Sequence, residues 1–158
     1  MIGFLCYQDF LVKKNVKKDN QGRRFTDENH NDLGDIDVLA IDTRYRIIYV
    51  IEVKNYQFSR NNPDEIFSEL QKMKKYYEKH IRRVHWVCGH KGVVCSLFDI
   101  NETTGYKIKE AIITKAPVLA KHLLDKSINI IVEYELTEKK LNSLPTAKMI
   151  KTTNKSFF

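Results

Sequence analysis

Four charged side chains stand at the ends of two apolar runs, and they carry the chemistry that this sequence suggests. Asp35 and Asp37 open the run G-D-I-D-V-L-A-I-D, and Glu52 and Lys54 close the run I-I-Y-V-I-E-V-K. Between these charges, the residues expected to be buried are apolar. Two such runs, joined by the short segment T-R-Y-R, predict a β-hairpin.

The register of this hairpin decides whether the four charges meet. A turn centred on T-R-Y-R pairs Asp42 with Ile47. The same register places Asp37 directly opposite Glu52, and the two remaining charges also face each other. Because side chains alternate between the faces of a strand, all four charges should project from one face at one end of the hairpin. Opposed carboxylates repel each other, and a divalent cation removes that penalty.

A cluster of three carboxylates and a lysine suits the hydrolysis of a phosphodiester bond. Carboxylate oxygens, waters and substrate phosphate oxygens are the ligands that Mg²⁺ prefers. A metal ion held there would polarise the phosphoryl group and lower the pKa of a bound water. Lys54 lies on the same predicted face as Glu52, so it could position or deprotonate that water, or neutralise charge in the transition state.

The spacing of Asp37, fourteen intervening residues and then Glu52-Val53-Lys54 resembles the PD-(D/E)xK nuclease superfamily, which has the restriction-endonuclease-like fold. The flanking text I-D-V-L-A and V-I-E-V-K-N-Y is similar to its nuclease-related and resolvase-like branches. The resemblance implies that Asp37 and Glu52 bind Mg²⁺, which Mn²⁺ can replace. It also implies that the backbone carbonyl of Val53 is a further metal ligand and that Lys54 is the catalytic lysine. The proline of the family's name is absent, since Ile36 precedes the first aspartate.

A helix is expected after the hairpin, with Asn62 as its cap, Pro63 at its first position and Glu65 three residues after the cap. Apolar side chains recur at helical spacing and predict its buried stripe, which is Ile66, Leu70, Met73 and Tyr77. Lysines on the other side would lie near the phosphodiester site. A glutamine on the flank invites comparison with one that some branches of the family place on this helix. The candidates for contacts with nucleic acid are Arg60, Gln71, Lys72, Lys75 and Lys79.

The polar segment of residues 20–33 is predicted to be a loop. As an alternative to a solvated loop, it could face the substrate. In that case Glu28 or Asp32 would help to hold the metal, and Arg23 or Arg24 would contact a phosphate.

The remaining elements predict an α/β fold in which a mixed central sheet of about five strands is flanked by helices, in the restriction-endonuclease-like arrangement. Strands are expected within residues 1–18 and at 84–90, 92–100, 111–113 and 128–134, with a helix over 117–124. Residues 1–136 form the predicted nuclease-like domain, and residues 137–158 a flexible basic tail. The resembled family has a longer first helix with a further glutamate, so we expect this chain to be one domain of a longer polypeptide.

Composition narrows the class of protein. The net charge of +7 favours a polyanionic partner. The three cysteines match no disulfide framework, which favours an intracellular location, in the cytoplasm, nucleoid or nucleus. No apolar run approaches the ~20 residues of a membrane helix, so we expect a soluble protein without a membrane partner. A zinc site is not expected, because the candidate ligands match no zinc spacing and period two places the first two on opposite faces of a strand. These candidates are His85, Cys88, His90 and Cys95.

The function predicted from these observations is Mg²⁺-dependent cleavage of nucleic acid. DNA is favoured over RNA because the resembled branches mostly cut DNA. Cleavage of both strands would need a homodimer. The alternatives are a catalytically inactive module of the same fold that binds nucleic acid, and a protein-binding scaffold.

Overall fold

A five-stranded mixed sheet forms the centre of the computed structural model, which describes residues 10–55, 62–118, 122 and 128–147. The first three strands form an antiparallel meander, and the last two run parallel to the third. The strands follow one another across the sheet in chain order: β1 (Leu11–Val16), β2 (Ile36–Asp42), β3 (Ile47–Lys54), β4 (Lys107–Thr114) and β5 (Ile130–Val132). The predicted α/β class and mixed sheet are therefore confirmed.

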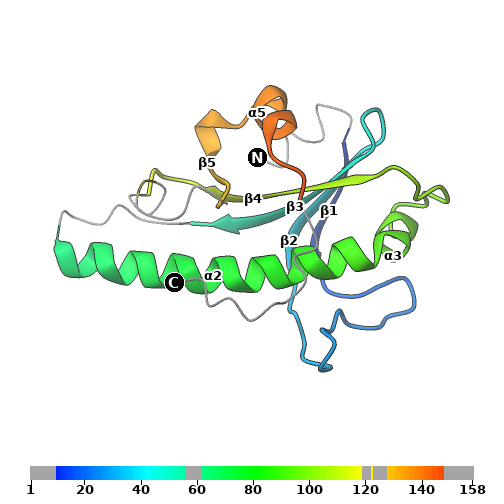
Figure 1. The fold of residues 1–158 in the computed structure, drawn as a ribbon, viewed down its shortest axis with the longest axis horizontal. Coiled ribbons are helices and arrows are strands. Elements are labelled where there is room, and N and C mark those ends of the chain that lie inside the picture. The colour runs from blue at the N-terminus through cyan, green and yellow to red at the C-terminus, as the bar shows by residue number, and fades with distance from the viewer. Residues whose placement is uncertain (1–9, 56–61, 119–121, 123–127, 148–158) are drawn as a thin grey trace.

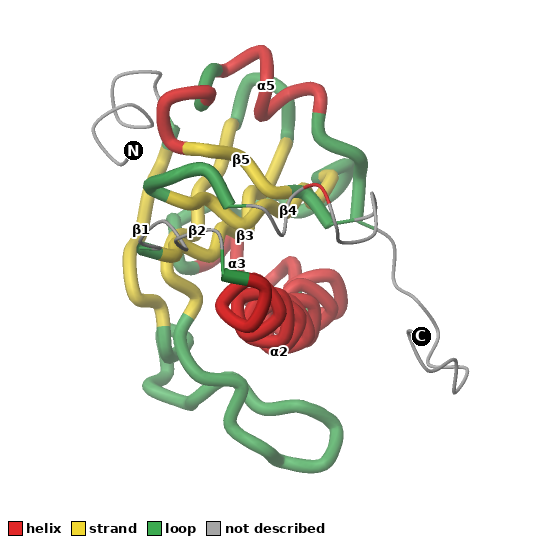
Figure 2. Tube along the Cα trace, turned by 90° about the vertical axis from the view of Figure 1, so that its left-hand side faces the viewer, coloured by secondary structure: helices red, strands yellow, loops and turns green. Residues whose placement is uncertain are grey.

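Helices cover the two faces of this sheet. The long helix α2 (Pro63–Gly89) and the short helix α3 (Lys91–Ser96) lie on one face, as Figure 1 shows. The 3₁₀ turn η1 (Glu133–Glu135) and helix α5 (Glu138–Ser143) lie on the other face, which the end-on view of Figure 2 separates clearly. Within the described part of the chain, no helix is long and apolar enough to span a membrane.

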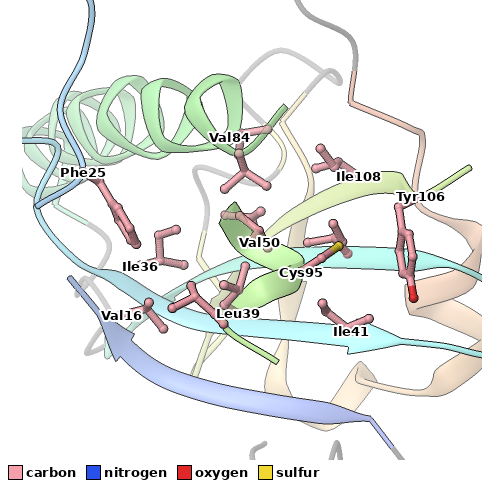
Figure 3. Close-up of a cluster of buried hydrophobic side chains, with 14 of the residues drawn as sticks. Val16, Phe25, Ile36, Leu39, Ile41, Val50, Val84, Cys95, Tyr106 and Ile108 are labelled. Atoms are coloured by element: carbon pink, nitrogen blue, oxygen red, sulfur yellow. The ribbon is translucent and has the colours of Figure 1, made fainter. Parts of the chain in front are cut away.

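The central strands are apolar on both faces because both faces are covered. Leu39, Ile41 and Val50 point toward α2 and pack with Val84 and other side chains in the cluster of Figure 3. On the opposite face, a second cluster joins alternate residues of the same strands to the C-terminal segment. It includes Val38, Ala40, Tyr49, Ile51, Leu141 and Leu144.

The predicted hairpin register is confirmed. Asp42 pairs with Ile47, and Val38 pairs with Ile51 in the same register. The side chain of Asp42 also closes the turn, since its Oδ1 accepts a hydrogen bond of 3.0 Å from the backbone N–H of Arg44. A turn held in this way fixes which residues of β2 and β3 face each other.

The strands predicted at 84–90 and 92–100 are wrong. Residues 84–89 continue α2, and α3 occupies Lys91–Ser96. The short run V-H-W-V-C is apolar enough for either structure, and its length cannot separate a strand from a buried turn of helix. Val84 and Val87 are buried at a spacing of three, which continues the helical stripe of Met73 and His80.

The beginning of α2 agrees with the prediction. The side chain of Asn62 caps the helix by accepting a hydrogen bond of 3.0 Å from the backbone N–H of Asp64, and Pro63 stands at the first position. Within the predicted stripe, Met73 is fully buried, whereas the other three side chains are half-buried.

The C-terminal region differs from the prediction. Strand β5 ends at Val132, and residues 133–135 form η1 instead of continuing the strand. Residues 137–147 are not a flexible tail, because they contain α5 and Leu141 is fully buried. Most of the helix predicted over 117–124 lies outside the described residues, as do residues 1–9 and 148–158.

Candidate functional site

Asp37, Glu52 and Lys54 meet on the face of the sheet that α2 covers. Asp37 is two residues from Leu39, and Glu52 is two residues from Val50, so these side chains lie on the same face as the cluster under α2. The ammonium nitrogen of Lys54 lies 2.6 Å from Oε1 of Glu52 and 3.7 Å from Oδ2 of Asp37. The hairpin therefore brings the two acids and the lysine together.

The Asp37 carboxylate is held by the neighbouring strand. Its Oδ2 accepts a hydrogen bond of 2.8 Å from the backbone N–H of Val53. Its other oxygen, Oδ1, accepts no hydrogen bond from the residues that the structure describes. Burial, together with the negative charge of Glu52, raises the pKa of Asp37 although the Val53 N–H, Lys54 and Arg83 act in the opposite direction. This carboxyl group therefore binds a proton more tightly than an ordinary aspartate.

Glu52 is buried, with 4% of its surface exposed, and two cations neutralise it. Lys54 contacts one of its oxygens, and the guanidinium nitrogen NH1 of Arg83 lies 2.6 Å from the other. A buried carboxylate is tolerated only when it is paired and hydrogen-bonded. The site thus contains two carboxyl groups, Asp37 and Glu52, and two basic side chains, Lys54 and Arg83, so its formal charges balance.

Arg83 comes from α2 and is the site residue that sequence reasoning missed. Its Nε donates a hydrogen bond of 2.8 Å to the carbonyl of Leu33, which fixes the guanidinium between the helix and the loop before β2. Gly34 has a φ of +72°, and a Cβ there would lie 3.1 Å from NH2 of Arg83, so glycine lets this loop approach the arginine closely. Arg83 was missed because a strand was predicted from residue 84. The signal was present, because no Pro or Gly interrupts residues 64–88.

Asp35 does not join the other acids, so the predicted cluster of three carboxylates is wrong. Its carboxylate lies 3.8 Å from the ammonium of Lys17. Strand β2 begins at Ile36, and the side chain of Ile36 packs in the same cluster as that of Leu39, which breaks the period-two alternation at this point. Among the described residues, no group of three His, Cys, Asp or Glu side chains could hold a metal ion.

The loop candidates Arg23, Arg24 and Asp32 pair with other residues between β1 and β2. Oδ1 of Asp32 accepts a hydrogen bond of 2.8 Å from the backbone N–H of Gly34, and its Oδ2 pairs with Arg24. Arg23 pairs with Asp19 at 2.8 Å. These contacts give the loop a defined shape, and none of them places a carboxylate beside Asp37.

The predicted nucleic-acid contacts on α2 lie at the surface. Four of the five candidates have exposed side chains, namely Gln71, Lys72, Lys75 and Lys79, and Arg60 lies outside the described residues. Among the zinc candidates, His85 and Cys88 stand three residues apart on a helix and not on opposite faces of a strand. Cys88 and Cys95 are free thiols.

The donor chemistry of the site fits a magnesium ion in part. Asp37 and Glu52 offer hard oxygen ligands on adjacent strands, and among the described residues none donates a hydrogen bond to Oδ1 of Asp37. Both oxygens of Glu52 are engaged, however, by Lys54 and Arg83. A cation bound between the carboxylates would therefore have to replace at least one of these two contacts.

Comparison of the chain with protein-family models, with curated proteins and with solved structures finds no match.

Proposed function

We propose that this protein is a metal-dependent nuclease that hydrolyses phosphodiester bonds of nucleic acid, with DNA favoured, and that its sheet has the restriction-endonuclease-like arrangement. The observation that carries the proposal is the meeting of Asp37 and Glu52 around the ammonium of Lys54. The net charge of +7 supports a polyanionic substrate.

The proposed roles follow from the contacts of each group. Asp37 and Glu52 would hold Mg²⁺ or Mn²⁺, with the Val53 carbonyl as the third candidate ligand. A bound metal ion supplies polarisation of the phosphoryl group and a water of lowered pKa. The ammonium of Lys54 lies beside the proposed metal ligands and 4.8 Å from the centroid of the Tyr76 ring. From this position it would donate to a phosphate oxygen or orient the attacking water.

A binding module without catalysis is the second candidate function, and one observation favours it. Arg83 and Lys54 neutralise Glu52 without any metal, so the acids are stable as members of an ion-pair network. In such a module, Asp37 and Glu52 would hold the basic side chains in place, and nucleic acid would bind to the surface lysines.

Cleavage assays on paired variants test the nuclease. Plasmid and single-stranded DNA are incubated with the full chain and Mg²⁺, Mn²⁺ or a chelator. Asp37→Asn should abolish metal-dependent cleavage, and Lys54→Met should slow it by about 10²–10³-fold, the range for loss of one hydrogen-bond donor to the charge that develops in the transition state.

The matched controls are Asp35→Asn and Lys14→Met, which remove the same charges at exposed positions outside the cluster. Both controls should cleave like the unaltered chain. Retained metal-dependent cleavage in Asp37→Asn and Lys54→Met would refute the assignment. Binding of DNA without cleavage under any of these conditions would support the binding module instead.

A further inference from the structure

A basic pocket lies beside the acidic cluster, between α2 and the loop that precedes β2. It is shallow and open to solvent, with a volume of about 160 Å³. The loop between β1 and β2 passes beside α2 in both Figure 1 and Figure 2, and the pocket forms where the two approach. We define the basic pocket by its lining residues, Asp32, Leu33, Gly34, Lys79, Arg82 and Arg83.

Two of the three cations in the basic pocket, Lys79 and Arg82, lie at the surface, and Arg82 is attracted electrostatically by the carboxylate of Asp27. Within the described part of the chain, neither Lys79 nor Arg82 makes an ion pair or a hydrogen bond to a side chain or carbonyl, and both are exposed. Their spacing of three residues on a helix puts the two side chains on the same surface. They are therefore available to an anion from solution.

The acid that lines the basic pocket does not compensate these cations. Asp32 receives a hydrogen bond from the backbone N–H of Gly34 and pairs with Arg24, so both of its oxygens are engaged. The charge of Asp32 is matched by Arg24, which does not line the pocket. Asp27 attracts Arg82 from outside the pocket, but its oxygens accept hydrogen bonds from Asn29 and Asn31, and within the described residues it makes no ion pair with the arginine. Lys79 and Arg82 together therefore carry more positive charge than this one acid offsets.

Arg83 connects the basic pocket to the acidic cluster. Its NH1 donates to Glu52 and its Nε donates to the Leu33 carbonyl, while Arg83 also lines the pocket. A planar guanidinium presents several N–H donors in a fixed fork, so one arginine can serve a carboxylate and an anion on its other edge. An oxyanion in the pocket would thus lie next to the candidate metal ligands.

We propose that the basic pocket binds a phosphate of the nucleic-acid backbone, next to the phosphate that the Asp37–Glu52 site cleaves. This inference rests on the proposed nuclease function. Lys79 and Arg82 would contact the phosphate directly, and Arg83 would set its distance from Glu52. The strand would then run from the acidic cluster toward the C-terminal half of α2, away from Lys72 and Lys75.

Binding measured without metal separates this proposal from the nuclease. The affinity of the full chain for labelled single-stranded and duplex DNA is measured in chelator over a series of salt concentrations. The double variant Lys79→Met/Arg82→Met is compared with Lys139→Met/Lys140→Met, which removes the same charge from α5 on the opposite face of the sheet.

The pocket variant should bind roughly ten- to thirtyfold more weakly at physiological salt, and the slope of its salt dependence on duplex DNA should fall by about 0.9, the contribution of the one phosphate that Lys79 and Arg82 share. The control should keep the slope and affinity of the unaltered chain. Equal losses in the two double variants, or no binding by the unaltered chain, would overturn the proposal. If the pocket variant alone loses binding while no chain cleaves, the phosphate contact is supported and the nuclease is not.

A second arm distinguishes an internal phosphate from a terminal one. Oligonucleotides with a 5′-phosphate or a 5′-hydroxyl should bind equally well if the basic pocket takes the backbone. A preference for the 5′-phosphate that disappears in Lys79→Met/Arg82→Met would overturn the backbone assignment and make the pocket a site for strand ends.

Discussion

At the scale of single residues, the candidate site is a balanced group of charges and not an isolated acidic cluster. Glu52 is nearly inaccessible to water, and a cation contacts each of its two oxygens. Asp37 is more exposed, and its Oδ1 accepts no hydrogen bond from the part of the chain that the structure describes, so it is the carboxylate that a ligand from solution would reach first. The two acids therefore differ in their surroundings: Glu52 holds two cations in a buried position, and Asp37 is the more exposed carboxylate.

The raised pKa of Asp37 gives a pH dependence with a definite sign. A carboxyl group whose pKa is higher in the folded protein than its ordinary value of 3.8 binds protons more tightly when folded. The free energy of unfolding should therefore fall as the pH rises from 3.8 through the raised pKa. Asp37→Asn lacks this ionisation, so it should gain stability relative to the unaltered chain over that interval.

Urea unfolding of the two proteins at a series of pH values in chelator measures this difference. When the free energy of unfolding of the unaltered chain is subtracted from that of Asp37→Asn at each pH, the contributions of the titrating groups that both proteins share cancel. A difference that is constant with pH, or that favours the unaltered chain as the pH rises, would contradict the raised pKa.

At the scale of elements, α2 does more than cover the sheet. It is a single helix of 27 residues, and its C-terminal half carries Arg83 onto Glu52 of β3. The hairpin of β2 and β3 fixes the two acids, but the buried glutamate is satisfied only when the helix docks. Docking of α2 and formation of the site are therefore coupled.

Substitution of the arginine tests this coupling. Arg83→Met should lower the free energy of unfolding by about 2–4 kcal/mol, because it removes one of two partners from a buried carboxylate. The neighbouring Arg82→Met, at an exposed position, should change it by at most about 0.5 kcal/mol. Denaturant unfolding at neutral pH gives both values.

A double-mutant cycle with Glu52→Gln isolates the Arg83–Glu52 pair. The loss of unfolding free energy caused by Arg83→Met should be smaller when residue 52 carries no charge. Equal stabilities of Arg83→Met and Arg82→Met would show that the helix does not depend on this contact.

At the scale of the whole molecule, the C-terminal segment completes the second face of the sheet. Leu141 is fully buried against the cluster of β2, β3 and β4, and the hydroxyl of Tyr49 donates a hydrogen bond of 2.7 Å to Oδ1 of Asn142. The backbone N–H of Ala147 donates to the carbonyl of Ile108 at 2.8 Å. Residues 137–147 thus belong to the folded domain.

Leu141→Ala should therefore lower the free energy of unfolding by about 2–5 kcal/mol, as for other leucines deleted from a packed core. Lys139→Ala on the exposed side of α5 is the control and should change it by at most about 0.5 kcal/mol. Thermal unfolding followed by circular dichroism compares the two. A loss from Leu141→Ala no greater than that of the control would show that residues 137–147 are not part of the core.

The amino-acid pattern was enough to predict the hairpin, its register and the meeting of Asp37, Glu52 and Lys54, because period-two alternation and a short turn are local properties. It also determined the start of α2, since a cap and a proline act within one turn. Packing between distant elements set the pairing of Arg83 with Glu52 and the separation of Asp35 from the cluster, and it selected helix over strand for residues 84–89, where the absence of Pro and Gly was the one sequence signal. Each of these depends on which surfaces are covered by elements distant in the chain. A short apolar run suits a strand or a helix equally well, and the partner of a buried charge is set by packing and not by its neighbours in sequence.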